Sequence, residues 1–272
     1  GGTLGISGAL MQALFRNPLA DPGLLGVSSG AAAGASVMIV LGSGLGITGF
    51  SSIWGLPMAA FVGALFTTLI VWRLGTKGGR SDVTTMLLAG IAINALAGAF
   101  TGLMVLLAND AQLRSLTFWT LGSLNGSTWS YVGIVSVAVC LLVLGIPLLG
   151  RPLNAILLGE HEAVCLGVPV ELYKKVIIVL TSISVGASVA FTGMIGFVGL
   201  VAPHMVRLMV GPDHRVVLPG SMLLGSVLLL NSDLAARMFV PPAEIPIGIV
   251  TALIGAPYFL WLLKKTQVRS SL

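Results

Sequence analysis

Long apolar stretches alternate with short polar breaks along the whole chain. Asp, Glu, Lys and Arg are absent from blocks that include 22–72, 83–109, 115–150 and 176–206. A helix needs about 20 mainly apolar residues to cross a bilayer, so each block can hold at least one spanning helix. The alternation over about ten residues that marks an outer-membrane β-barrel does not run through these blocks. The pattern predicts a polytopic helical membrane protein.

Gly, Pro and charged residues divide the apolar blocks into predicted spans. The spans are 24–42, 56–72, 83–106, 131–149, 175–192, 194–210, 216–234 and 245–263. Residues 1–15 have the composition of a further, partial helix, and no initiator Met precedes them. We therefore expect an all-α helical bundle in a single transmembrane domain, 1–272, whose mature chain begins earlier than this sequence.

Composition and charge add a topology to these spans. The chain is 56% hydrophobic and 8% charged, whereas soluble domains are about a quarter charged. If connections lie on alternate sides, Arg114 and Arg237 fall on one side and the other twelve of the 14 Lys and Arg residues fall on the opposite side. The positive-inside rule makes the larger set cytoplasmic. That set is Arg16, Arg73, Lys77, Arg80, Arg151, Lys174, Lys175, Arg207, Arg215, Lys264, Lys265 and Arg269.

The same rule divides the block between Lys175 and Arg207. One long helix would place these two residues on opposite sides of the membrane, whereas two helices that turn near Thr192 and Gly193 place both inside. We therefore predict two helices in this block.

Small and polar residues inside the spans indicate helix packing. Glycines recur every four residues at Gly26, Gly30 and Gly34, and again at Gly98 and Gly102. Such spacing favours intramolecular helix packing over a hinge or a homodimer seam. Polar residues at membrane depth usually face protein or a water-filled path. They are Gln12, Asn94, His204, Asn231 and Asp233.

The roles of these polar residues differ. His204 has no Cys, Asp or Glu three or four residues away, so a buried hydrogen-bonded site is favoured over a metal ligand. Asn94 can line a path or join helices, and both alternatives stay open. Asp233 is spaced to pair with Arg237.

The connection 150–175 is the longest one on the predicted cytoplasmic side. The sequence has no G-x-x-x-x-G-K-[ST] phosphate loop, so any use of ATP requires a partner. In the connection, Leu153, Ile156 and Leu157 have helical spacing and precede an acidic patch. We predict two short helices around a Gly turn, either folded on their own bundle or exposed as a docking surface for a soluble subunit.

Four long strings carry a family resemblance: SGALMQALFRNPLADPGLLGVSSGA, LLGEHEAVCLGV, TGMIGFVGLVAPHMVRLMVGPDHRVVLPGS and ARMFVPPAEIPIGIVTALIGAPYFLWLL. They closely resemble the FecCD-type permease subunits of bacterial ABC importers for iron-siderophores, haem and cobalamin. The resemblance implies a permease with ten transmembrane helices, of which helices two to ten are present here. It also implies a homodimer in the inner membrane, with two ATPase subunits inside and a substrate-binding protein outside.

The implied function is ATP-driven import by alternating access. An iron chelate, either an iron-siderophore or haem, is the favoured substrate and cobalamin is the alternative. The resemblance implies no cofactor in this chain, because the partner ATPase binds ATP and Mg. An ion-gradient-driven secondary transporter is a third hypothesis, which would be expected to have intramembrane carboxylates.

The resemblance also carries over residues by position. Arg237 matches a residue that docks the binding protein. The contacts implied for the ATPase are Glu160, His161, Glu162, Leu166 and Gly167. The candidates for the translocation path and its gate are Ser81, Thr84, Thr85 and Asn94.

The string RNPLADPG, residues 16–23, is predicted to be a rigid turn on the cytoplasmic side. Pro18 and Pro22 interrupt helices, while Asn17 and Asp21 can accept hydrogen bonds from freed backbone N–H groups.

Overall fold

Helices dominate the computed structural model, which describes residues 1–42, 50–239 and 245–270. The helical elements are α1 (Gly2–Leu14), η1 (Pro22–Leu25), α2 (Val27–Leu41), α3 (Phe50–Gly75), α4 (Val83–Leu107), α5 (Asp110–Leu121), α6 (Trp129–Leu158), α7 (Glu160–Cys165), α8 (Val170–Thr192), α9 (Val198–Val210), α10 (His214–Met238) and α11 (Ile247–Ser270). Two short strands, β1 (Thr76–Lys77) and β2 (Arg80–Ser81), form an antiparallel hairpin.

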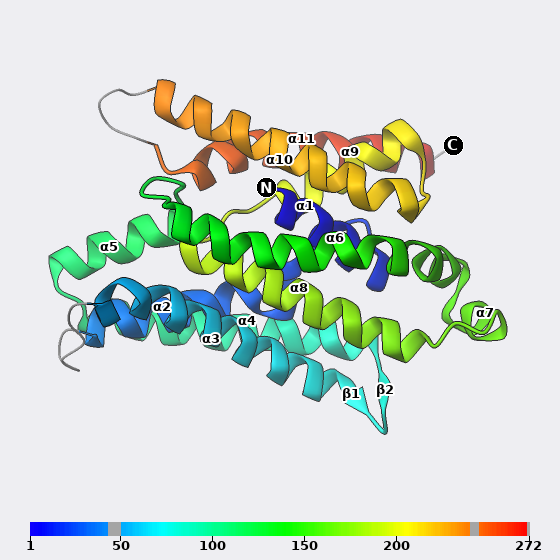
Figure 1. Ribbon diagram of the computed structural model, residues 1–272, viewed down its shortest axis with the longest axis horizontal. Coiled ribbons are helices and arrows are strands. Elements are labelled where there is room, and N and C mark those ends of the chain that lie inside the picture. Colours follow the sequence, from blue (N-terminus) through cyan, green and yellow to red (C-terminus); the bar gives the residue numbers. More distant parts are fainter. Residues whose placement is uncertain (43–49, 240–244, 271–272) are drawn as a thin grey trace.

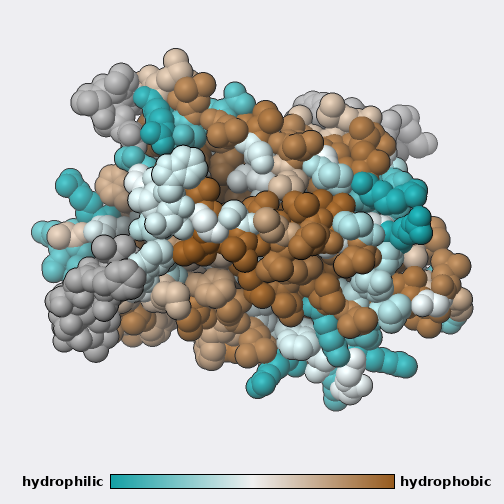
Figure 2. Space-filling view, viewed as in Figure 1, coloured by the Kyte–Doolittle hydropathy of each residue, from teal (hydrophilic) through white to brown (hydrophobic). Residues whose placement is uncertain are grey.

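The long helices run along the longest axis of the molecule (Figure 1). The hairpin, α7 and the turn between α9 and α10 lie at one end, on the right of Figure 1, which we call the α7 end. Helix α5 and the last turn of α10 lie at the opposite end, the α5 end. Hydrophobic side chains cover the middle of the face in Figure 2, and hydrophilic ones gather mainly towards the edges. The bundle therefore has the polarity of a membrane protein viewed from the side.

Each predicted span corresponds to a helix. Five helices in the described part of the chain are long and apolar enough to cross a membrane: Trp54–Leu74, Val83–Leu107, Trp129–Leu158, Val170–Thr192 and His214–Met238. Three shorter apolar helices, Val27–Leu41, Val198–Val210 and Ile247–Leu260, occupy the remaining predicted spans. The chain is thus a multi-pass, all-α protein.

The predicted division of the block between Lys175 and Arg207 is confirmed. Helix α8 ends at Thr192 and α9 begins at Val198. Gly193 follows α8 with φ 70°, a backbone conformation that favours glycine, and lets the chain turn back towards the α7 end.

Helix α1 is the interior helix of the bundle. Every residue from Gly2 to Leu14 is buried, and small residues let neighbouring backbones approach closely. A Cβ atom added to Gly8 would lie 1.8 Å from the carbonyl oxygen of Gly199 in α9.

The predicted glycine packing is confirmed for α2. A Cβ atom on Gly34 would lie 2.0 Å from the carbonyl oxygen of Ala59 in α3. Gly98 and Gly102 on α4 differ, because an added Cβ would meet no atom of the described chain within 4 Å. Intramolecular packing therefore explains the first glycine series but not the second.

The turn at residues 16–23 is not confined to the α7 end, which corrects the sequence prediction. The carbonyl oxygen of Gly23 accepts a hydrogen bond of 3.1 Å from Asn94, halfway along α4. A Cβ on Gly90 would lie 1.9 Å from the carbonyl oxygen of Leu24. The chain therefore rises into the bundle before α2 begins. Non-helical backbone is tolerated at such depth where protein groups satisfy its hydrogen bonds. Here Asn94 donates to the Gly23 carbonyl oxygen, and the Asp21 carboxylate accepts a hydrogen bond of 2.8 Å from the Gly23 N–H.

Candidate functional site

The α7 segment projects from the α7 end (Figure 1). It follows Gly159, a position whose backbone conformation favours glycine. Gly159 ends α6 with φ 144° and ψ 150°, a region almost restricted to glycine. An added Cβ there would also lie 1.7 Å from Glu162 Oε2. Of the two short helices predicted around a Gly turn, one is α7 and the other is the last turns of α6, which continues unbroken to Leu158.

Four of the five predicted ATPase contacts form one exposed surface on and after α7. They are His161, Glu162, Leu166 and Gly167. Leu166 itself is 65% exposed, and two further apolar side chains near it are exposed as well, Val164 at 61% and Leu158 at 68%. Apolar groups exposed together in this way are typical of an interaction surface.

The fifth predicted contact, Glu160, instead takes part in a network centred on Lys174, which we call the Lys174 node. Lys174 is 2% exposed. Its Nζ lies 2.7 Å from Glu160 Oε2, 3.1 Å from Glu171 Oε1 and 2.9 Å from the carbonyl oxygen of Ser81. The Ser81 N–H donates in turn to Glu171 Oε2 at 2.8 Å. The node joins α7, α8 and β2 across 93 residues of sequence.

Three of the predicted path and gate residues lie where the hairpin leads into α4. Ser81 is buried in β2, and its hydroxyl lies 3.1 Å from that of Thr76. Thr84 and Thr85 are exposed in the first turn of α4. Asp82 caps this turn by accepting from the Thr85 N–H at 2.8 Å and from the Thr85 hydroxyl. These bonds, the hydroxyl one foremost, hold the pKa of Asp82 below its usual range.

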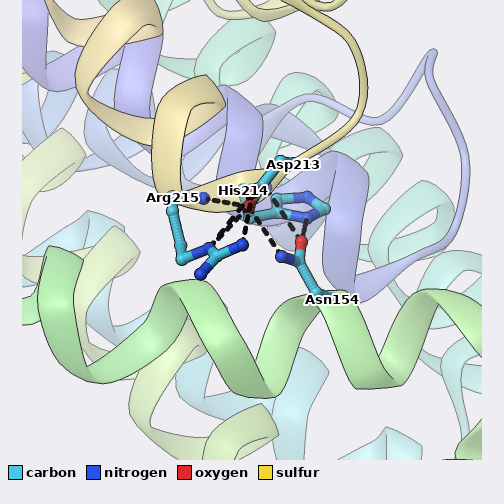
Figure 3. A network of polar contacts seen from close by, with 4 residues as sticks. All are labelled: Asn154, Asp213, His214 and Arg215. Atoms are coloured by element: carbon cyan, nitrogen blue, oxygen red, sulfur yellow. Dashed lines mark hydrogen bonds and ion pairs between the residues drawn. The ribbon is translucent and has the colours of Figure 1, made fainter.

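A second network at the same end joins α6 to α10 (Figure 3), and we call it the Asn154 node. Asn154 Nδ2 donates to Asp213 Oδ1 at 2.7 Å, and Asn154 Oδ1 accepts from the His214 N–H at 2.9 Å. His214 is fully buried. The guanidinium of Arg215, followed by the Asn154 amide, holds the pKa of Asp213 well below its usual range. Asp213 therefore stays ionised at neutral pH.

Asn94, the fourth path candidate, makes interhelical contacts. It donates to the carbonyl oxygen of Gly23 at 3.1 Å, and its Oδ1 accepts from the Ser29 hydroxyl. Its amide thereby ties the middle of α4 to the start of α2. Two roles were left open for Asn94. These contacts show that it joins helices, and its role in lining the path stays a prediction.

Arg237, the predicted docking residue, lies at the α5 end, near the end of α10. Its Nε lies 2.9 Å from Asp233 Oδ2, so the pairing expected from their spacing is confirmed. The two side chains are 44% and 24% exposed. Arg237 is therefore accessible from outside the chain, as a docking residue must be.

The other polar residues singled out from the sequence are separate from both nodes. Gln12 donates to the Leu200 carbonyl oxygen and accepts from Arg207, while Asn231 donates to the Val227 carbonyl oxygen of its own helix. Cys140 and Cys165 are free thiols. Within residues 1–42, 50–239 and 245–270, no group of three or more His, Cys, Asp or Glu side chains is placed to hold a metal ion.

Sequence comparison identifies the family. The family model described as "FecCD transport family" matches residues 1–265. The chain belongs to the FecCD transport family. Among curated FecCD proteins, the hemin transport system permease protein HmuU of Yersinia pestis is 44% identical over 274 residues, covering 100% of this chain and 80% of that protein.

Other FecCD relatives have a different named substrate. The cobalamin import system permease protein BtuC of Halobacterium salinarum is also 44% identical, over 99% of this chain and 70% of its own length. The vitamin B12 import system permease protein BtuC of Klebsiella pneumoniae is 41% identical, over 99% of this chain and 79% of its own length. Both relatives are named as permease proteins of import systems.

A solved structure agrees with the FecCD assignment. It shows an inward-facing conformation of a metal-chelate type ABC transporter, at a TM-score of 0.88 and 34% identity. The match covers 97% of this chain and 82% of that chain. The chain is therefore an ABC importer permease of the FecCD family, a transport component.

Proposed function

We propose that this chain is the permease subunit of an ATP-driven importer that moves an iron chelate, an iron-siderophore or haem, across the bacterial inner membrane by alternating access. The observation that carries the permease assignment is the match of the FecCD family model to residues 1–265, and the 44% identity to the hemin permease over the entire chain supports an iron chelate as substrate. Cobalamin is the second candidate substrate, because a cobalamin permease reaches the same identity.

The proposal assigns the α7 end to the cytoplasm and the α5 end to the outside. The basic residues support this orientation, because Arg73, Lys77, Arg80 and Arg151 lie at the ends of α3, the hairpin and α6 that meet at the α7 end (Figure 1). Two ATPase subunits, which bind ATP and Mg, contact the exposed surface of α7. A substrate-binding protein docks at Arg237. The chain itself needs no cofactor in this scheme.

A second copy of the permease completes the translocation path. Helix α4 is the least buried of the long apolar helices in the described part of the chain. Its exposed side chains include Leu88, Ile91, Leu96, Phe100 and Leu103. Gly98 and Gly102 lie on the same helix with open space beside them. A homodimer that brings two copies of α4 together would cover this surface, and Asn94, Thr84 and Thr85 would lie along the path beside it.

The test is uptake into proteoliposomes that contain the permease with its ATPase and binding protein. We expect uptake of a radiolabelled ferric siderophore or of hemin with ATP inside, unchanged when ionophores collapse proton and sodium gradients. Uptake of labelled cobalamin alone would select the second substrate. Uptake that persists when the ATPase is inactivated, and that requires an ion gradient, would instead establish a secondary transporter.

A further inference from the structure

The ammonium group of Lys174 is unusual among the basic residues of the α7 end because it is buried. Its side chain is 3% exposed, against 42% for Glu160 and 34% for Glu171. A lysine has three N–H donors, and here the three acceptors are Glu160, Glu171 and the Ser81 carbonyl oxygen. Every donor is used, so the position of the ammonium group is fixed by three parts of the chain at once.

The three partners lie on three different elements of the chain. Glu160 is the first residue of α7, Glu171 lies in the first turn of α8, and Ser81 is the last residue of β2. A buried charge that loses a partner is costly, because water cannot replace it. Helix α7 therefore cannot move away from β2 without breaking the node or carrying β2 with it.

The hairpin in turn is fastened to the start of α4. The Asp82 N–H donates to the Gly75 carbonyl oxygen at 2.9 Å, and the Asp82 carboxylate caps α4. Met86, in the first turns of α4, is 1% exposed and packs so tightly that a Cβ on Gly75 would lie 2.1 Å from it. The Ser81 peptide is held from both sides, by Glu171 at its N–H and by Lys174 at its carbonyl. A displacement of β2 is therefore a displacement of the first turns of α4.

Helix α4 is also able to respond to such a displacement. It is the least buried of the long apolar helices in the described part of the chain. A Cβ atom added to Gly98 or Gly102 would meet no described atom within 4 Å. The half nearer the hairpin packs closely on its neighbours at Met86 and Gly90, and the polar tie at Asn94 lies halfway along the helix. This half therefore carries a displacement of the hairpin as far as Asn94, and the open glycines lie beyond that point.

We propose that Lys174 is a positioning residue that makes α7, the first turns of α8, the hairpin and the first half of α4 move as one unit, so that movement of α7 opens or closes the path at α4. The inference rests on the proposed function, in which the ATPase moves α7. Lys174 then converts a displacement at the ATPase contact into a displacement of the path helix, without touching either ATP or the substrate.

The test compares K174M with K175M in the complete importer in proteoliposomes. Methionine keeps the length and volume of the buried side chain, and the two partly exposed carboxylates can be hydrated. Lys175 is the exposed neighbour on the same helix and serves as the matched control. The measured quantity is the number of substrate molecules imported per ATP hydrolysed. We expect at least a fivefold fall in this ratio for K174M, recovery of at least half in K174R, and no change for K175M.

A merely structural role for Lys174 would lower the thermal stability of the assembled complex without changing the ratio of transport to hydrolysis. A wild-type ratio in assembled K174M, or an equal fall in K175M, would overturn the inference. If K174M does not assemble, E171Q replaces it, since glutamine can still accept from the Ser81 N–H but loses the ion pair; the same two outcomes apply. Absence of ATP-dependent uptake in the wild type would instead defeat the proposed function.

Discussion

The two ends of the bundle hold their charges in different ways. At the α7 end, Lys174 is 2% exposed and joins elements that are 93 residues apart in sequence. At the α5 end, Arg237 is 44% exposed at its side chain and pairs with Asp233 within a single helix turn. A buried, fully bonded charge fixes the relative position of the elements it joins, whereas an exposed pair between neighbours on one helix contributes little and exchanges partners easily.

This contrast fits the two tasks that the proposed function assigns. Motion must be transmitted at the α7 end, which requires fixed links between α7 and the path helix. A partner must bind and leave at the α5 end, which requires an accessible charge. The α7 end also contains the Asn154 node, which ties α6 to α10 and so anchors the coupling segment on its other side. The two nodes at this end can therefore be separated by experiment.

The largest effect is expected from G159A. Alanine is strained at φ 144° and its Cβ would overlap Glu162, so the junction between α6 and α7 must rearrange. We expect ATP-dependent uptake to fall more than tenfold. The control is G133A in α6, where an added Cβ meets no described atom within 4 Å. Equal uptake by both variants would show that the geometry of α7 does not matter for coupling.

The second effect concerns the α5 end. R237E replaces an accessible positive charge with a negative charge next to Asp233. We expect the affinity for the binding protein to fall about tenfold, which is ~1.4 kcal/mol. The loss should depend on salt. R114E on α5 changes charge at the same end and is the control. Surface-bound permease and titrated binding protein measure the affinity, and unchanged affinity for R237E would remove the docking role.

The third effect separates the Asn154 node from the Lys174 node. N154A removes the hydrogen bonds that Asn154 makes to the His214 N–H and the Asp213 carboxylate. We expect the free energy of unfolding to fall by about 1–3 kcal/mol. Chemical unfolding in detergent measures this loss. Because this node anchors rather than transmits, the remaining assembled importer should transport as many substrate molecules per ATP as the wild type. A fall in that ratio equal to that of K174M would erase the distinction between the nodes.

The smallest effect is a pH dependence at Asp213. Its folded pKa is lowered, chiefly by Arg215, so its contribution to stability is present above the unfolded pKa of about 3.9 and is lost as the pH falls through the folded pKa. The difference in melting temperature between wild type and D213N should therefore be constant from pH 5 to pH 8. It should shrink below pH 4. A difference that changes between pH 6 and pH 8 would contradict this assignment.

Much of the fold could be predicted from charge-free blocks, because a helix in lipid satisfies its own backbone and needs only length and apolar side chains. The break after Thr192 was also predictable, since the positions of Lys175 and Arg207 required it. Helix α5 and the hairpin were not predicted. Their local signals are present, a capping box at Asn109 and a Gly78–Gly79 turn, but neither lies in an apolar block.

The site was less predictable because its links are long-range. In the sequence, Lys174 is only one of twelve basic residues assigned to the cytoplasmic side. Its neighbours in sequence do not indicate that Ser81 and Glu160 contact its ammonium group. The depth of the turn after Arg16 was missed for the same reason. Its burial depends on Asn94, which lies 71 residues from Gly23. Contacts between distant segments require the packed structure.

The most direct test of the central claim measures distances within one permease copy. In a C140S/C165S background, spin labels at K77C on the hairpin, V164C on α7 and V216C on α10 are introduced in pairs, in importers with one labelled copy. We expect the distance from 77 to 164 to stay the same between nucleotide-free and ATP-bound states, while the distance from 77 to 216 changes. A change in the distance from 77 to 164, with that from 77 to 216 constant, would contradict the account.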